Sequence, residues 1–290
     1  MKILRELSVE GCELVGSGFS GDVYRLDGDT VLKVYRDPDS LTEIEHEQYL
    51  SRLAFVRGIP TVIPFGAAKV GERYGSLFEF ADAESLSRYI SEHPQNLDGI
   101  IMKYAGLLDT FHSAEFKPGE LPAMKDVYIS RLDETAPFLP AGVKDRLIYL
   151  LRSMPDDFHA LHGDIHPNNI MISGGNLTVI DLHNLSTGNR VFDFGSLFVS
   201  LSAFNENYPE NVKFLGLDAD TDRKIYRGLL RHCFGGYVSD IEDRIKTAGY
   251  MRMLYIFAVR LNGAKKYNAG IENAVKNLAD LCGRVQSLAI

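Results

Sequence analysis

Hydrophobic and polar residues alternate through the first 80 residues of the chain, and short turns break the alternation. This pattern predicts an antiparallel sheet, because successive side chains of a strand point to opposite faces. One helical pattern interrupts it from Leu41 to Gly58, with Ser40 as its expected N-cap. From Ser85 onward the apolar spacing is mainly helical, and it predicts helices over 85–92, 97–114, 124–135, 142–153, 194–204, 219–234, 239–262 and 270–288.

A hairpin pattern stands apart in the helical half, between residues 169 and 181. Two apolar runs flank the segment Ser173-Gly174-Gly175-Asn176, whose glycines and asparagine accept the positive φ of a tight turn. Pairing of the two runs is expected to place Asn169 beside Asp181. A short hinge near residues 81–84 is expected to divide the chain into parts 1–81 and 82–290.

A glycine-rich string, G-x-G-x-x-G-x-V, begins at Gly16 and includes Gly18 and Gly21. The glycine spacing alone is weak, because dinucleotide-binding folds share it. A dinucleotide-binding loop opens a helix, whereas residues 22–35 read as strand, turn, strand. Glycine loops that cap a β-hairpin are typical of kinases, whose loop amides close over nucleotide phosphates.

Lys33 lies between apolar residues in the middle of a predicted strand. It either points to solvent from an edge strand or meets a buried partner, and the glycine loop favours the second reading. A strand lysine that contacts the α- and β-phosphates is usually fixed by a helix glutamate. Glu43 and Glu47 share one face of the predicted helix. We favour Glu47, because apolar anchors follow it, and Glu43 remains the alternative.

Residues 162–169 carry the pattern H-x-D-x-x-x-x-N and lead directly into the hairpin. Asp164 is expected to orient a substrate hydroxyl and to accept its proton. Asn169 and Asp181 would supply oxygen ligands to Mg²⁺, which prefers hard oxygen donors. Each motif alone has an ordinary structural explanation, but the full set follows the order that phosphoryl transfer requires.

A literal Asp-Phe-Gly triplet begins at Asp193, but no strand precedes it. We therefore reject Asp193 as the metal ligand in favour of Asp181, which ends an apolar strand. Asp193 is expected to cap the helix that follows it and to hold the catalytic loop by accepting backbone hydrogen bonds.

Composition narrows the functional classes without choosing a substrate. The formal net charge is −8 with no basic block, which argues against nucleic acid as a partner. No apolar run is long enough to cross a membrane, and the first residues carry no secretory pattern, so a cytoplasmic location is expected. The three cysteines are widely spaced and are expected to be reduced.

The string His162-Gly163-Asp164-Ile165-His166-Pro167-Asn168-Asn169 resembles the H-G-D-x-H-x-x-N signature of kinase-like phosphotransferases, the family of aminoglycoside phosphotransferases and choline kinases. The resemblance implies an α+β, bilobal protein-kinase-like fold. Its N-lobe (1–81) would be a small antiparallel sheet with one helix, and its C-lobe (82–290) would be larger and mainly helical. ATP would bind in the cleft, with the backbone of Glu79 and Ala81 meeting the adenine edge. Residues 182–184 differ from the family pattern, in which a second acidic or aromatic residue often follows the metal-binding aspartate. This difference affects the geometry expected for the metal site.

The favoured function is therefore a small-molecule kinase that uses ATP and Mg²⁺ to phosphorylate a hydroxyl group. An aminoglycoside, choline or an amino sugar would suit the acidic chain. A non-catalytic nucleotide-binding module is the alternative, although no core residue is missing. A protein kinase is less favoured, because Gly163 replaces the usual arginine and too few residues follow Asp181 for an activation segment. The acidic segments 218–222 and 240–243 are better explained as helix starts than as amine sites.

Overall fold

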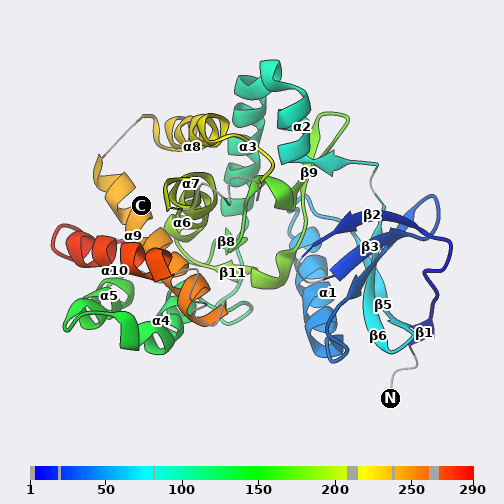
Figure 1. Cartoon of the computed structure of the whole chain (residues 1–290), viewed down its shortest axis with the longest axis horizontal. Coiled ribbons are helices and arrows are strands. Elements are labelled where there is room, and N and C mark those ends of the chain that lie inside the picture. The colour runs from blue at the N-terminus through cyan, green and yellow to red at the C-terminus, as the bar shows by residue number, and fades with distance from the viewer. Residues whose placement is uncertain (1–3, 19–20, 81, 208–214, 237–238, 261–267) are drawn as a thin grey trace. The chain divides into compact units, whose positions relative to one another are not determined.

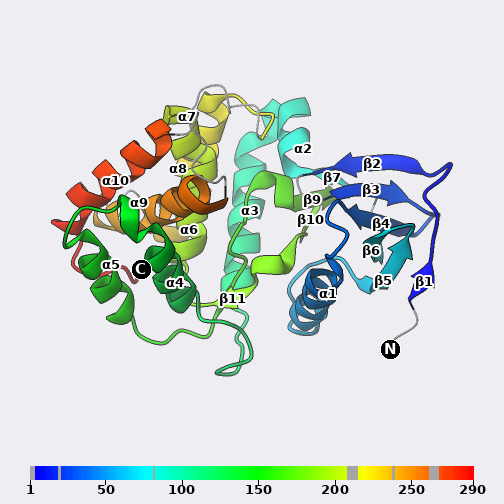
Figure 2. The same ribbon diagram turned by 60° about the horizontal axis from the view of Figure 1, so that its bottom comes forward.

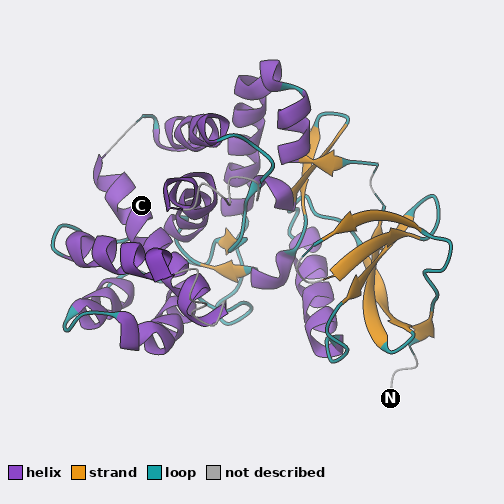
Figure 3. Ribbon diagram, in the orientation of Figure 1, coloured by secondary structure: helices purple, strands orange, loops and turns teal. Residues whose placement is uncertain are grey.

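The computed structural model describes residues 4–18, 21–80, 82–207, 215–236, 239–260 and 268–290. These residues group into two compact units, of which the first holds residues 1–84 and 170–183 and the second holds 85–169 and 184–290. The hairpin 170–183 thus groups with the first unit, whereas the sequence-based division assigned it to the second part. Figure 3 shows strands concentrated in the first unit and helices in the second.

The first unit is built on a six-stranded sheet of order β1-β5-β6-β4-β3-β2. Its neighbours pair antiparallel, as predicted, except that β1 runs parallel to β5. Helix α1 lies along β5 and β6 (Figure 1). The bounds of these elements are β1 Arg5–Glu6, β2 Glu13–Ser17, β3 Gly21–Arg25, β4 Thr30–Tyr35, α1 Leu41–Val56, β5 Pro64–Val70 and β6 Arg73–Glu79.

The predicted hairpin is present as β9 (Ile170–Ser173) and β10 (Asn176–Val179), which pair antiparallel across a Gly174-Gly175 turn. Both glycines have positive φ, as this turn requires. Strand β7 (Glu84–Ser85) adds to β9 in a three-stranded sheet. The ladder ends at Ile170 and Val179, so it includes neither Asn169 nor Asp181, and their adjacency stays a prediction.

The second unit is mainly helical, and its central helices α6 and α9 pack against each other (Figure 2). Their close approach depends on glycine, because a Cβ on Gly195 would lie 2.9 Å from the backbone nitrogen of Gly249. Two short strands, β8 and β11, pair antiparallel nearby. The elements are α2 Leu86–Glu92, α3 Leu97–His112, α4 Met124–Thr135, α5 Val143–Arg152, β8 Ala160–Leu161, β11 Ser186–Thr187, α6 Val191–Phe198, α7 Phe204–Asn207, α8 Ala219–Phe234, α9 Ser239–Tyr255 and α10 Asn268–Cys282.

Several predicted helix ends are corrected by the structure. The helix predicted at 194–204 begins at Val191, and it changes to a π-helical turn over Val199–Ala203. The helix predicted at 239–262 ends at Tyr255, where a second π-helical turn, Ile256–Arg260, follows. Apolar spacing does not distinguish these turns from the α-helix that they continue.

Two expectations from composition can be compared with the structure. Among the described residues, no helix is long and apolar enough to cross a membrane. The three cysteines are free thiols, as predicted, and burial raises the pKa of Cys233 to about 12. At neutral pH that thiol carries no charge, which indicates a structural role.

Candidate functional site

Lys33 on β4 lies between two carboxylates of the first unit. Its Nζ lies 3.5 Å from Oε1 of Glu47 on α1 and 3.6 Å from Oδ1 of Asp181, which follows β10. The lysine and glutamate side chains are 16% and 5% exposed. Lys33 therefore does not point to bulk solvent from an edge strand, and β4 lies inside the sheet between β6 and β3.

Tyr35 contacts both members of this ion pair, and the sequence reasoning missed it. Its hydroxyl donates to Oε2 of Glu47, and the Lys33 ammonium lies 4.8 Å from the centre of its ring. Burial, followed by the negative charge of Glu47, raises the pKa of Tyr35, so the phenol remains protonated. The two-residue spacing from Lys33 would have placed Tyr35 on the same face of the strand, which is the signal that could have found it.

The glycine-rich loop joins β2 and β3, which pair antiparallel. The amide of Gly18 donates to the carbonyl of Gly21 at 2.9 Å, and this hydrogen bond joins the two described ends of the loop. A Cβ on Gly21 would lie 2.3 Å from the carbonyl oxygen of Val34, so only glycine fits there. Gly16 lies in β2 beside Val23. The structure thus confirms that strand β3, a turn and strand β4 follow the loop, where a dinucleotide-binding loop would open a helix.

The predicted adenine contacts lie at the end of β6. The amide of Glu79 donates to the carbonyl of Ile63 at 2.9 Å, so an adenine contact would have to use the Glu79 carbonyl. The next amide, that of Phe80, donates to Asp29 at 2.7 Å. Ala81 lies outside the described residues. Both adenine contacts stay predictions.

Asp181 adopts a conformation that is rare for residues other than glycine. Its φ is 65°, the left-handed region that aspartate tolerates better than most residues. His183 Nδ1 lies 2.8 Å from the same carboxylate oxygen that faces Lys33. Such backbone strain concentrates at functional sites, which is consistent with a ligand role for this carboxylate.

The second unit holds the H-x-D-x-x-x-x-N segment, residues 162–169. Asn169 is buried, and its Nδ2 donates to the backbone carbonyl of Asp164 at 2.9 Å. The amide nitrogen is thereby engaged within the loop, which leaves the amide oxygen as the atom suited to a metal ion. The Asp164 side chain is 22% exposed and lies 4.0 Å from Nε2 of His166.

The donor chemistry fits Mg²⁺. Among the described residues, no group of three or more His, Cys, Asp or Glu side chains is placed to hold a metal ion. Mg²⁺ does not need such a cage, because it is usually held by one or two carboxylates together with phosphate oxygens and water. The Asp181 carboxylate is such a ligand, and the amide oxygen of Asn169 is a further hard oxygen donor of the type that Mg²⁺ prefers.

Asp193 accepts backbone hydrogen bonds from the segment that carries Asp164, as predicted. It is fully buried, and its two oxygens accept from the amides of His162 at 3.0 Å and Gly163 at 2.7 Å. Burial acts to raise its pKa, but the hydrogen bond and charge of His112, with smaller contributions from His162 and Gly163, outweigh burial and lower it. The prediction that Asp193 caps its helix was wrong, because the helix begins earlier, at Val191.

Arg252 on α9 is the second residue that sequence reasoning missed. Its Nη2 lies 2.6 Å from Oδ1 of Asp164, and its Nη1 donates to the carbonyl of Gly163 at 2.7 Å. It is the one charged residue in the stretch 248–259 of the sequence, and this isolation is the signal that could have drawn attention to it.

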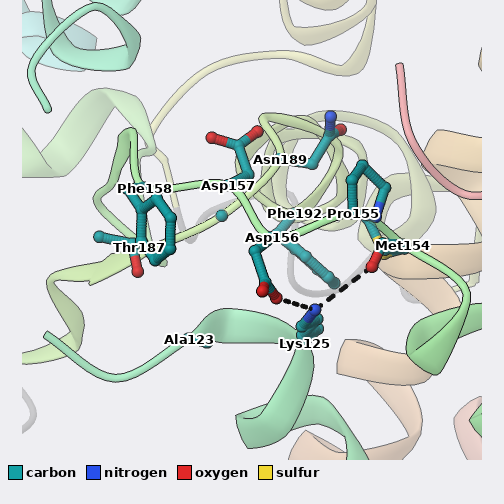
Figure 4. Close-up of a pocket in the computed structure, with 11 residues that line it drawn as sticks. Ala123, Lys125, Met154, Pro155, Asp156, Asp157, Phe158, Thr187, Asn189 and Phe192 are labelled. Atoms are coloured by element: carbon teal, nitrogen blue, oxygen red, sulfur yellow. Dashed lines mark hydrogen bonds and ion pairs between the residues drawn. The ribbon is translucent and has the colours of Figure 1, made fainter. Parts of the chain in front are cut away.

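A pocket elsewhere in the second unit is not part of this site (Figure 4). Its volume is about 30 Å³, room for little more than one or two water molecules. Lys125, one of the lining residues, donates to the Met154 carbonyl and to Asp156. The pocket is far too small for a nucleotide, since ligand pockets usually measure about 300–1,000 Å³.

A family model for the "Phosphotransferase enzyme family" matches residues 11–223, which include the glycine-rich loop, Lys33, Asp164 and Asp181. The chain belongs to this phosphotransferase family. The resemblance inferred from the H-G-D-x-H-x-x-N string is thereby confirmed, and membership supports a phosphotransferase. No curated protein matches the chain in sequence.

Solved structures of phosphotransferases share the fold. A choline/ethanolamine kinase family protein from Mesorhizobium loti is 18% identical, with a TM-score of 0.59 over 93% of this chain and 87% of its own. The GDP and kanamycin complex of APH(2")-IIIa is 15% identical, with a TM-score of 0.60 over 93% of both chains. A thermostable mutant of aminoglycoside phosphotransferase APH(4)-Ia, in a ternary complex with ADP and hygromycin B, is 14% identical, with a TM-score of 0.58 over 95% and 96%. The predicted kinase-like α+β fold class is confirmed.

Proposed function

We propose that this family member is a small-molecule kinase that transfers the γ-phosphate of ATP to a hydroxyl group of its substrate. The observation that carries the proposal is the position of Lys33, whose ammonium lies between the carboxylates of Glu47 and Asp181 at 3.5 and 3.6 Å. A strand lysine fixed by a helix glutamate and next to an aspartate suited to a metal ion is the arrangement that protein kinases use for phosphoryl transfer from ATP.

The proposed roles follow from the chemistry of each group. The glycines at 16, 18 and 21 and Lys33 bind the phosphates, while Glu47 holds Lys33 in position. Mg²⁺, held by Asn169 and Asp181, would neutralise charge on the phosphates. Asp164 orients the substrate hydroxyl and accepts its proton. The hydroxyl oxygen bonds to the γ-phosphorus, and the bond from the γ-phosphorus to the oxygen that bridges it to the β-phosphorus of ATP breaks, so that ADP leaves with that oxygen.

The proposed substrate is a small molecule with a hydroxyl group and an amine, such as an aminoglycoside, choline or an amino sugar. Two observations support this class. The family's structural relatives include complexes with kanamycin and hygromycin B. The chain carries a net charge of −8, which tolerates a cationic substrate. Dependence on ATP fits the cytoplasmic location that we propose, with neither nucleic acid nor membrane as a partner.

The test is Mg²⁺-dependent release of ADP from ATP in the presence of pooled aminoglycosides, choline and ethanolamine, amino sugars and sugar alcohols. Asp164→Asn should abolish release that depends on a pool. Asp156→Asn is the matched control, because it removes an equal charge from a carboxylate that is 73% exposed. Release that needs both one pool and Asp164 supports the proposal.

Three other outcomes would contradict it. Binding of MgATP without release in any pool would favour a non-catalytic nucleotide-binding module. Phosphorylation of the chain itself or of a generic protein substrate would favour a protein kinase. Absence of nucleotide binding would contradict the whole mechanism.

A further inference from the structure

Arg252 holds both the backbone and the side chain of the catalytic segment. Its guanidinium lies 2.7 Å from the carbonyl oxygen of Gly163 and 2.6 Å from Oδ1 of Asp164. The arginine side chain is 8% exposed. Helix α9, which carries it, is packed against α6, the helix that supplies Asp193 to the same loop.

The cost of burying this charge indicates that the contact is specific. A buried guanidinium loses several kcal/mol of hydration, and only well-placed partners compensate for the loss. Here the planar fork meets two acceptors on consecutive residues. One is a backbone carbonyl and the other is Oδ1 of the Asp164 carboxylate, so the rotation of the carboxylate is fixed relative to the loop.

Two other arginines of this unit show what a purely structural arginine does here. Arg244, on the same helix, also combines a backbone carbonyl with a carboxylate, since it donates to the carbonyl of Ala289 at 2.5 Å and to Asp240. Arg146 donates to the carbonyl of Val285 at 2.8 Å. Both hold the C-terminal segment, whereas Arg252 binds the carboxylate that the proposed reaction uses.

We propose that Arg252 is a positioning residue for Asp164 that fixes the direction in which the carboxylate faces the substrate hydroxyl. Ser196, whose Oγ lies 3.5 Å from Oδ1 of Asp164, assists at longer range. This inference rests on the proposed function. The shape of the guanidinium matters as well as its charge, because a lysine ammonium is a point charge that cannot reproduce the fork.

The first test separates turnover from binding. Arg252→Lys and Arg252→Gln should each lower kcat for pool-dependent ADP release by about 10- to 100-fold, since small displacements of a catalytic group have effects of that size. The dissociation constant for MgATP should change by less than about twofold, because no contact proposed for the nucleotide is lost. Arg252→Lys should retain more activity than Arg252→Gln.

Arg244→Gln is the matched control, because it removes a guanidinium from the same helix without touching Asp164. Thermal unfolding of all variants identifies any loss that comes from misfolding. Wild-type kcat in folded Arg252→Lys and Arg252→Gln would overturn the inference. So would a loss of MgATP binding equal to the loss of kcat, which would indicate a merely structural role.

The second test needs neither substrate nor nucleotide. In ¹⁵N spectra of the arginine side chains, Arg252 should show slow rotation of its guanidinium, and Asp164→Asn should speed that rotation and shift the signal. An Arg252 signal that does not respond to Asp164→Asn would overturn the contact itself. Failure of the proposed function is distinguishable from failure of the contact. A wild-type protein that releases no ADP, while its Arg252 signal still responds to Asp164→Asn, would contradict both the proposed function and the positioning role, although the contact itself would stand.

Discussion

Replacement of Asp222 by Asn should stabilise the protein at neutral pH. Asp222 lies in the first turn of α8 and is 1% exposed. Nδ2 of Asn205 donates to its Oδ2 at 2.8 Å, but its buried Oδ1 has no hydrogen-bond partner among the described residues. Burial raises the pKa of Asp222 from 3.8 to about 6, aided by the charge of Asp218 and opposed by the bond from Asn205.

The sign and size of the effect follow from this pKa. Because the folded-state pKa lies above the unfolded value, the stability that protonated Asp222 contributes is fully present below pH 3.8 and is lost as the pH rises through about 6. A shift from 3.8 to about 6 corresponds to about 3 kcal/mol at most. We expect about 1–2 kcal/mol, since relaxation and hydration around the ionised group recover part of the cost.

Urea unfolding at pH 4.5 and pH 7.5 measures this effect. The difference in unfolding free energy between Asp222→Asn and wild type should be about 0.5–1.5 kcal/mol larger at pH 7.5 than at pH 4.5, because pH 4.5 lies above the unfolded pKa of 3.8 and part of the effect is already present there. Asp220→Asn is the control, because it makes the same charge change at a carboxylate that is 62% exposed on the same helix. A difference that is constant between the two pH values, or equal in the control, would refute the reasoning.

Three further predictions concern the helix packing and the site. Gly195→Ala should destabilise the second unit by about 1–3 kcal/mol in thermal unfolding, because its Cβ would lie 2.9 Å from the backbone of α9. Gly106→Ala, where a helical Cβ meets nothing within 4 Å, should instead stabilise by about 0.5–1 kcal/mol, and equal effects would contradict the packing argument. Tyr35→Phe removes the hydroxyl that donates to Glu47 and should weaken MgATP binding by up to about tenfold in calorimetry; unchanged affinity would argue against a positioning role. Asp193→Asn should cost about 2–4 kcal/mol in urea unfolding, because an amide has one oxygen to serve two loop amides, and a neutral effect would show that the brace is dispensable.

Local patterns in the sequence predicted much of the site. The Lys33–Glu47 ion pair follows from two local patterns. Alternation along β4 directs Lys33 toward one face of the sheet, and helical spacing along α1 directs Glu47 toward the same face. The hairpin of β9 and β10 follows from its glycine-rich turn. The bracing by Asp193 follows from the exclusion of a metal role, since a buried carboxylate without a metal needs hydrogen-bond donors.

Features that depend on distant packing or on loop chemistry were not predicted. The contact between Arg252 and Asp164 joins residues 88 positions apart, and no spacing rule relates them. The parallel pairing of β1 with β5 depends on a two-residue strand, too short to show a pattern. The early start of α6 depends on Asn189, whose Oδ1 accepts from the amide of Val191 at 3.1 Å, a turn that apolar periodicity does not detect.

Gly163 and Arg252 together determine the conformation of the segment that carries Asp164. Gly163 has a φ of 76°, and a Cβ there would lie 2.8 Å from Cβ of Asn184 and 3.0 Å from Cε of Met124, so a larger residue would strain the loop. A guanidinium reaches this segment from α9 instead, where Arg252 binds the carbonyl of Gly163 and the carboxylate of Asp164. Both contacts lie within the second unit and are formed by the protein alone, without a nucleotide or a substrate. We therefore expect Asp164 to be held in position before any substrate binds.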